Sequence, residues 1–114
     1  MIIRKHGLEL NKDKYKIKKG YLETLETNEG DCEIFCGSNT KIVCGSNCKI
    51  NCGDHCKIIC GFGCKIKCGN NCEIESGRGT IILGWCGKNN CIYEFTKKET
   101  ILFRYGKFES KKTK

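Results

Sequence analysis

From residue 31 the sequence reads DCEIFCGS, NTKIVCGS, NCKINCGD, HCKIICGF, GCKIKCGN and NCEIESGR, six versions of one eight-residue unit. The consensus is x-C-K-I-x-C-G-x. Its isoleucine recurs at Ile34, Ile42, Ile50, Ile58, Ile66 and Ile74. A short, fixed period is the signature of a repeat architecture. We therefore take residues 31–76 as a repeat segment that determines the fold.

Each unit predicts one short β-strand followed by one turn. Small or apolar side chains alternate within the unit, as at Cys48, Ile50 and Cys52, and a period of two is typical of a strand. The strand is followed by Gly and, two residues later, by Asn, His or Gly in successive units. These residue types tolerate positive φ, so they favour a tight turn.

One unit is too short to enclose a core, so a coil needs two or three units. With two units per coil, residues sixteen apart stack at about 4.8 Å, the usual separation of paired strands. The isoleucines then form two facing inner ladders, one with Ile34, Ile50 and Ile66 and the other with Ile42, Ile58 and Ile74. We favour this two-sheet β-solenoid. The alternatives are a triangular coil of three units, or three chains that each contribute one strand per layer.

Two segments without the repeat flank the solenoid, and we interpret both as caps. Residues 1–30 contain short strand-like pieces and form the N-terminal cap. Residues 77–114 contain three predicted strands, at 80–83, 91–95 and 100–105, and end in a basic tail at 109–114 that we expect to be disordered. Caps cover the unpaired strand edges at the ends of a solenoid. The predicted fold is an all-β solenoid with a β cap at each end.

The composition bounds the function. The 114 residues suit one domain, and the net charge is +8. Residues 77–114 hold nine Lys and Arg against three Asp and Glu, so an anionic partner is expected there first. The chain lacks a long apolar run for a membrane span, and its start does not resemble a secretory signal. We expect a cytoplasmic protein.

Four lysines occupy the same outward position of successive units, Lys41, Lys49, Lys57 and Lys65. With two units per coil, Lys41 stacks on Lys57, and Lys49 stacks on Lys65. Stacked like charges are mildly destabilising. The lysines therefore either bind a negatively charged ligand or form a solvated face that discourages aggregation.

Other candidate binding residues are aromatic, aliphatic or basic. Val43 and Ile59 lie on one predicted outer face, which we expect to be covered by the ends of the chain or by a partner subunit. Phe62, in a turn between two glycines, is either a contact residue or a simple loop aromatic. Arg104 and Lys107 alternate with aromatic residues that could stack on bases, and the alternative is a solvated strand edge.

Twelve cysteines allow three interpretations. A small thiol suits a narrow interior in which leucine would overpack. Alternatively, the cysteines on either side of a turn form disulfides, in the pairs Cys44–Cys48, Cys52–Cys56, Cys60–Cys64 and Cys68–Cys72, with Cys86–Cys91 as a further pair. The missing secretory signal favours reduced thiols.

The third interpretation is a metal site. Two stacked turns would bring together Cys44, Cys48, Cys60 and Cys64 at one edge, and Cys52, Cys56, Cys68 and Cys72 at the other. Four thiolates suit zinc or an iron–sulfur cluster. The strand period alone explains the C-x3-C spacing, so our main expectation is that no cofactor is bound.

The repeat units resemble the cysteine-lined β-solenoids of insect antifreeze proteins, which also have short repeats and a narrow interior. Their ice-binding Thr-x-Thr ladders are replaced here by lysine. The capped layout is similar to that of bactofilins, the polymer-forming β-helices of the bacterial cytoskeleton, and the eight-residue period is shared with phage spike proteins. These resemblances imply an architecture and leave the function open.

No catalytic motif is present, so we expect a non-enzymatic protein. The leading hypothesis is a rigid scaffold or interaction module that self-associates. The alternative is a binder of nucleic acid or of an acidic protein, such as a phage or mobile-element accessory protein, that acts through the basic C-terminal third. A metal-binding or redox cysteine protein is the third hypothesis.

Overall fold

The computed structural model describes residues 1–86 and 89–110, and within them all side chains except those of residues 85, 86, 89 and 90. The described part is almost entirely β, with one short 3-10 helix. The elements are β1 (Ile2–Lys5), β2 (Leu8–Glu9), η1 (Lys12–Lys14), β3 (Tyr15–Lys18), β4 (Glu23–Thr27), β5 (Cys32–Phe35), β6 (Thr40–Val43), β7 (Lys49–Asn51), β8 (Lys57–Ile59), β9 (Lys65–Cys68), β10 (Cys72–Ser76), β11 (Ile81–Cys86), β12 (Asn89–Glu94), β13 (Glu99–Arg104) and β14 (Lys107–Ser110).

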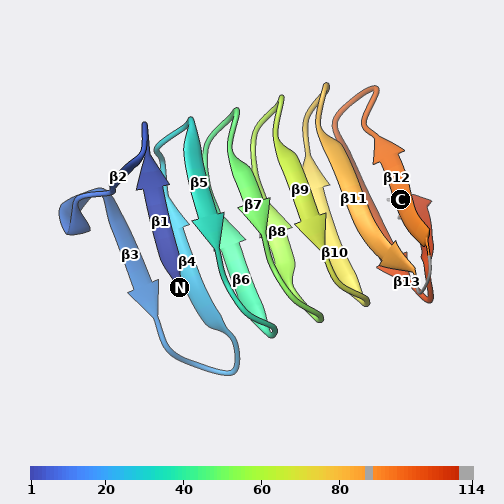
Figure 1. The fold of residues 1–114 in the computed structure, drawn as a ribbon, viewed down its shortest axis with the longest axis horizontal. Helices are drawn as coiled ribbons and strands as arrows, with labels where there is room; N and C mark the ends of the chain where they lie inside the picture. The colour runs from blue at the N-terminus through green and yellow to red at the C-terminus, as the bar shows by residue number, and fades with distance from the viewer. Residues whose placement is uncertain (87–88, 111–114) are drawn as a thin grey trace.

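The strands form two facing sheets of seven strands each (Figure 1). Sheet A has the order β12-β11-β9-β7-β5-β1-β2, and sheet B has the order β14-β13-β10-β8-β6-β4-β3. From β4 to β11 the chain changes sheet at every strand, so two strands make one coil. The predicted all-β solenoid with two units per coil is therefore confirmed.

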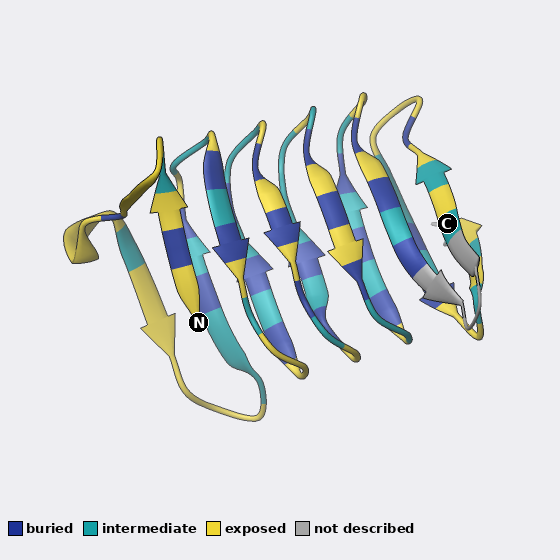
Figure 2. Ribbon diagram, in the orientation of Figure 1, coloured by how far each residue is buried: buried dark blue, intermediate teal, exposed yellow. Residues whose placement is uncertain are grey.

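Residues sixteen apart stack from β5 to β11, and β4 stacks on β6 with an offset of seventeen. The inward residues of these strands fill the interior. Ile34, Ile50, Ile66 and Ile82 form the inner ladder of sheet A. Leu25, Ile42, Ile58 and Ile74 form the ladder of sheet B. All eight side chains are at most 2% exposed, and Figure 2 shows this buried band crossing each strand. Parallel pairing thus extends past residues 31–76 on both sides, to β4 and to β11.

Each turn contains one residue with left-handed backbone geometry. From residue 31 to residue 79 every eighth residue has a φ between 55° and 73°, at Asp31, Asn39, Asn47, His55, Gly63, Asn71 and Gly79. The amide of each of the first five also donates to a carbonyl of the next coil, as from Asn39 N to Asp54 O at 2.9 Å. The predicted turns are confirmed, and His55 has the backbone role of its Asn counterparts.

The glycine before each turn lets neighbouring coils approach closely. A Cβ on Gly53 would lie 3.0 Å from the backbone nitrogen of Ser38 and 3.2 Å from its Cα. Gly53 N also donates to Gly37 O of the preceding coil at 3.3 Å. Gly37 itself lies at the N-terminal end of this row of turns, and a Cβ added there would have no atom within 4 Å. Coil-to-coil contact, and not an unusual φ, requires glycine at position 53.

Antiparallel strands close both ends of the solenoid. At the N-terminal end β1 pairs with β5, and β3 pairs with β4. At the C-terminal end β12 pairs with β11, and β13 pairs with β10 and β14. The β caps predicted from the sequence are therefore present. β14 is an additional strand, so Glu109 and Ser110 belong to it and not to the predicted tail. The rest of the tail, 111–114, lies outside the described residues.

Aromatic side chains fill the C-terminal end of the interior. Phe95 and Phe103 are at most 1% exposed. The rings of Phe103 and Phe108 lie 4.6 Å apart, and Tyr93 meets Phe95 edge to face at 5.4 Å. This cluster supplies large apolar area at the end of the isoleucine ladders, where no further coil covers them.

Substitution of Gly53 by Ala should destabilise the solenoid. The added methyl group would press on the Ser38 backbone, and overpacking of this kind costs about 1–3 kcal/mol. Gly37→Ala is the matched control, because open space surrounds its Cβ position. Urea unfolding followed by circular dichroism measures both. An equal loss of stability in the two variants would contradict the close-approach explanation.

Candidate functional site

The turns stack in two columns along the solenoid, and cysteines line the inside of both. The 36–72 column, where sheet A strands lead into sheet B, contains Cys36, Cys52, Cys56, Cys68 and Cys72. The 32–64 column, where sheet B strands lead into sheet A, contains Cys32, Cys44, Cys48, Cys60 and Cys64. Eight of these ten are at most 8% exposed, and Cys36 and Cys60 are half-buried. The ten cysteines of the two columns are free thiols.

Three sulfur atoms converge in the 36–72 column. The Sγ atoms of Cys52, Cys56 and Cys72 all lie within 4.8 Å of one another. Cys68, the fourth member of the quartet predicted from the sequence, is not part of this group. The other predicted quartet, Cys44, Cys48, Cys60 and Cys64, has all its side chains described and contains no comparable group of three. The predicted pair Cys86–Cys91 involves a side chain outside the described residues.

Burial and neighbouring thiols change the acidity of the cysteines. Burial raises the pKa of Cys32 to about 11. Hydrogen bonds from Cys36, Cys52 and Cys72 stabilise the thiolate of Cys56 and lower its pKa. Cys52 keeps its proton in its hydrogen bonds with Cys36, Cys56 and Cys72, so its pKa is raised. A hydrogen bond from Cys52 lowers the pKa of Cys72 as well.

Five of the ten column thiols also hydrogen-bond to backbone carbonyls of the turns, namely Cys32, Cys48, Cys56, Cys64 and Cys72. Cys56 Sγ donates to Gly37 O at 3.3 Å, and Cys72 Sγ donates to Gly53 O at 3.4 Å. In other coils a hydroxyl replaces the thiol. Ser76 Oγ donates to Gly61 O at 2.9 Å, and Thr80, which stacks on Cys64, is fully buried. Equivalent positions in different coils thus hold Cys, Ser or Thr. This exchange indicates that the general role of these side chains is to fill space beside the turns.

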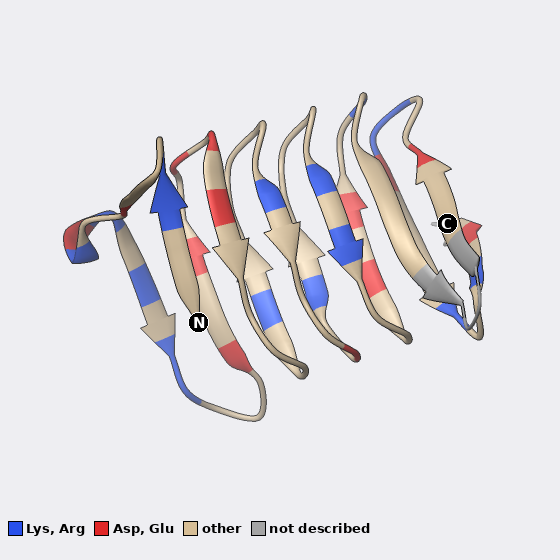
Figure 3. Ribbon diagram, in the orientation of Figure 1, with Lys and Arg blue, Asp and Glu red and all other residues tan. Residues whose placement is uncertain are grey.

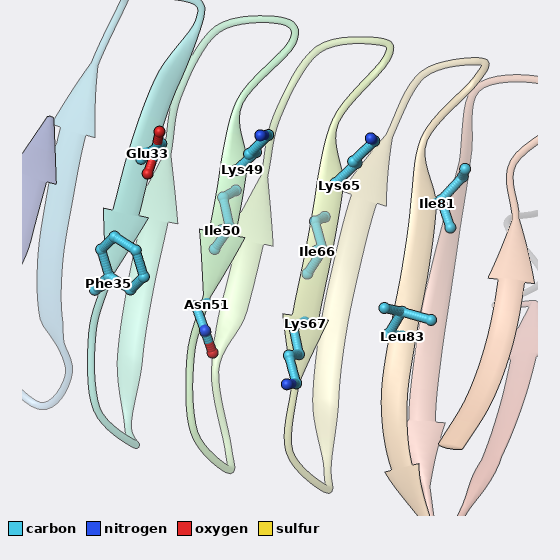
Figure 4. A pocket seen from close by; sticks show the side chains of 10 residues that line it. All are labelled: Glu33, Phe35, Lys49, Ile50, Asn51, Lys65, Ile66, Lys67, Ile81 and Leu83. Carbon is cyan, nitrogen blue, oxygen red and sulfur yellow. The ribbon is translucent and has the colours of Figure 1, made fainter. Parts of the chain in front are cut away.

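The outer face of sheet A carries a hollow of about 430 Å³, here called the sheet A hollow. Figure 4 shows Phe35 on β5 at one end, and Ile81 and Leu83 on β11 at the other. Phe35 is 40% exposed and Ile81 is 36% exposed. Glu33 lies on β5 beside Phe35, and the outward side chains between the two ends are Lys49, Asn51, Lys65 and Lys67. The inward Ile50 and Ile66 also line the hollow.

Two of the four predicted lysines lie on sheet A and two lie on sheet B, and Figure 3 shows basic residues on strands of both sheets. Lys49 pairs directly with Lys65 on sheet A, and Lys41 pairs directly with Lys57 on sheet B, as the sequence predicted. The sheet A pair is exposed and the sheet B pair is half-buried. Lys67 joins the sheet A pair at the hollow. Lys67 was not among the residues predicted from the sequence, because its position in the unit is not lysine elsewhere.

The remaining candidates lie away from the sheet A hollow. Val43 and Ile59 pair on sheet B and are half-buried. Phe62 is 62% exposed in a turn of the 32–64 column. Arg104 and Lys107 face each other in the β13–β14 hairpin of sheet B, and both are exposed. The structure therefore does not bring the basic C-terminal candidates together with the lysines of sheet A.

Comparison with known proteins adds no relative. No protein-family model, no curated protein and no solved structure matches this chain. Within the described residues, no helix has the length and apolar character needed to cross a membrane. The arrangement of the strands and the repeat itself thus identify a cysteine-rich β-solenoid, without a link to a specific family.

Substitutions at Cys48 test the packing role of the thiols. Cys48 is fully buried and lies in the same row as Cys64 and Thr80. Cys48→Thr should therefore keep the free energy of unfolding within about 1 kcal/mol of the original protein, whereas Cys48→Leu should lower it by about 1–3 kcal/mol through overpacking. Urea unfolding under reducing conditions distinguishes the two. An unchanged free energy of unfolding in Cys48→Leu would contradict the packing role, because it would show that the interior beside the turn has room for a larger side chain.

Proposed function

We propose that this protein is a non-enzymatic interaction module, a rigid β-solenoid whose sheet A hollow binds an acidic segment of a protein partner. The observation that supports the proposal is the composition of the hollow, with three lysines between two apolar ends. An extended segment with acidic residues at its centre and apolar residues on either side matches this arrangement in charge and polarity.

The lysines favour an anionic ligand. Lys49 and Lys65 are direct neighbours on adjacent strands, and like charges at this distance repel each other. Glu33 pairs with Lys49 on its other side and offsets one of the three lysine charges of the hollow. A carboxylate placed between them would relieve that repulsion. Charge complementarity of this kind increases the association rate and the specificity of binding.

The apolar ends favour a protein over a nucleic acid. Phe35 and Ile81 are partly exposed on strands whose inward residues belong to the core. Such side chains pack well against leucine or phenylalanine of a partner, whereas a phosphate backbone offers them little contact. Arg104 and Lys107, the residues with the stacking pattern, lie on the other sheet.

The same charges disfavour a second copy as the occupant. Two sheet A faces related by a twofold axis would place their lysine groups against each other at the centre of the contact. At the N-terminal edge of sheet A, the two-residue strand β2 also offers little backbone for pairing with another copy. Self-association, the other expectation from the sequence, therefore has less physical support than an acidic partner.

The central strands make the hollow a preorganised surface. β5, β7, β9 and β11 are paired on both sides along sheet A. Their inward isoleucines are buried, so the outward side chains start from a fixed backbone. A ligand that binds there does not need to order the protein first, which reduces the entropic cost of binding.

Charge reversal on each sheet tests the proposal. Fluorescence anisotropy with short peptides that carry Asp and Glu between Leu and Phe measures the affinity of the original protein, of the variant K49E/K65E/K67E and of the control K41E/K57E. We expect the sheet A variant to bind at least about tenfold more weakly, because three favourable charge pairs are lost. The sheet B control should bind nearly as well as the original protein, and added salt should weaken binding.

Other outcomes would overturn the proposal. An equal loss in the two variants, or equal affinity for uncharged peptides of the same apolar residues, would show that the sheet A lysines do not select the ligand. Tighter binding of a single-stranded oligonucleotide than of any acidic peptide would make the protein a nucleic-acid binder. A dimer at micromolar concentration that K49E/K65E/K67E dissociates would instead assign the face to self-association.

A further inference from the structure

We propose that Cys52, Cys56 and Cys72 form a binding site for one soft metal ion, with monovalent copper as the preferred ion. The proposal does not depend on the sheet A hollow, because the three sulfurs lie inside the solenoid at the 36–72 column.

The sulfur geometry suits a small ion at the centre of the group. The three Sγ atoms lie within 4.8 Å of one another, and their residues are 8%, 2% and 1% exposed. An ion equidistant from three sulfurs at that separation would be about 2.8 Å from each, near the metal–thiolate distance of about 2.3 Å. Small side-chain rotations of the three cysteines therefore suffice to complete the coordination.

The donor set selects the ion. All three ligands are sulfur, and the group contains no carboxylate or imidazole. Soft thiolates favour monovalent copper, zinc or iron–sulfur clusters. Structural zinc and iron–sulfur clusters take four protein ligands. Cys36 hydrogen-bonds to Cys52 and Cys56, but neither Cys36 nor Cys68 lies within 4.8 Å of all three sulfurs. Monovalent copper accepts two or three thiolates, so it fits the three converging sulfurs best.

Binding replaces S–H bonds by S–Cu bonds and releases the thiol protons to solvent, with no change in oxidation state. The turn carbonyls that lose a thiol donor keep a backbone donor. Gly37 O still accepts from Gly53 N at 3.3 Å, and Gly53 O still accepts from Gly69 N at 3.2 Å. Metal binding thus leaves no buried carbonyl without a partner at these two positions.

The chain itself offers variants that should preserve the fold. Thr40 occupies the position of Cys56 one coil earlier, and Ser76 occupies the position of Cys60 one coil later. Cys56→Thr therefore removes one proposed ligand with a side chain that the solenoid already contains. Cys60→Ser makes an equivalent change in the 32–64 column and is the matched control. Cys72→Ser removes a second ligand and serves if Cys56→Thr does not fold.

The experiment is an anaerobic titration of the reduced, full-length protein with monovalent copper, in competition with a colorimetric copper(I) chelator, and with native mass spectrometry to count bound ions. We expect the original protein and Cys60→Ser to bind the first ion with the same affinity and to develop sulfur-to-copper charge-transfer absorption. Cys56→Thr and Cys72→Ser should bind that ion at least about tenfold more weakly.

Three results would overturn the proposal. No bound copper in competition with the chelator would exclude the site. An equal loss of copper affinity in Cys60→Ser and Cys56→Thr would mean that copper binds thiols of the 32–64 column as well as those of the 36–72 column. Zinc that displaces copper from the three-cysteine site would show that the assigned ion is wrong. Circular dichroism and urea unfolding of each variant establish that the folded protein is being compared.

Discussion

Backbone packs directly against backbone where the turn of one coil meets the turn of the next. That contact leaves no room for a Cβ on Gly53, and it is accompanied by hydrogen bonds such as that from Asn39 N to Asp54 O. Once the turns stack, residues sixteen apart are forced into register. The isoleucine ladders, the stacked lysines and the sulfur columns all follow from this register.

The interior of the coil is narrow because only two short strands enclose it. One isoleucine or leucine from each strand fills the middle, and the positions beside the turns admit side chains no larger than Cys, Ser or Thr. A thiol is apolar enough to be buried and can donate to a turn carbonyl, as Cys56 does to Gly37 O. The same restriction that makes cysteine a good packing residue also places sulfur atoms close enough to share an ion.

The regular part of this fold was predictable, since a period of eight with alternating side chains leaves few other solutions. The turn residues and the pairing of Lys49 with Lys65 followed from that period. β4 and β11 were not recognised as coil strands, because Leu25 and Ile82 keep the inward pattern without the flanking cysteines. The metal interpretation of the cysteines placed them in symmetric quartets, whereas individual side-chain orientations determine that, among the described side chains, Cys52, Cys56 and Cys72 converge. The sheet A hollow depends on side-chain shape across four strands, and a repeat consensus does not contain that information.

The alternation of sheets along the chain has a consequence for how such a protein changes length. Each end cap is built to pair with particular strands, as β1 does with β5 of sheet A and β13 does with β10 of sheet B. A duplication or deletion of sixteen residues inserts or removes one whole coil and returns every later strand to its own sheet. A change of eight residues would exchange the two sheets for everything downstream and present the C-terminal cap with the wrong partner strands. We therefore expect such proteins to change length in evolution by whole coils of sixteen residues. Insertion or deletion of a single eight-residue unit would be selected against, because the C-terminal cap would no longer meet its partner strands.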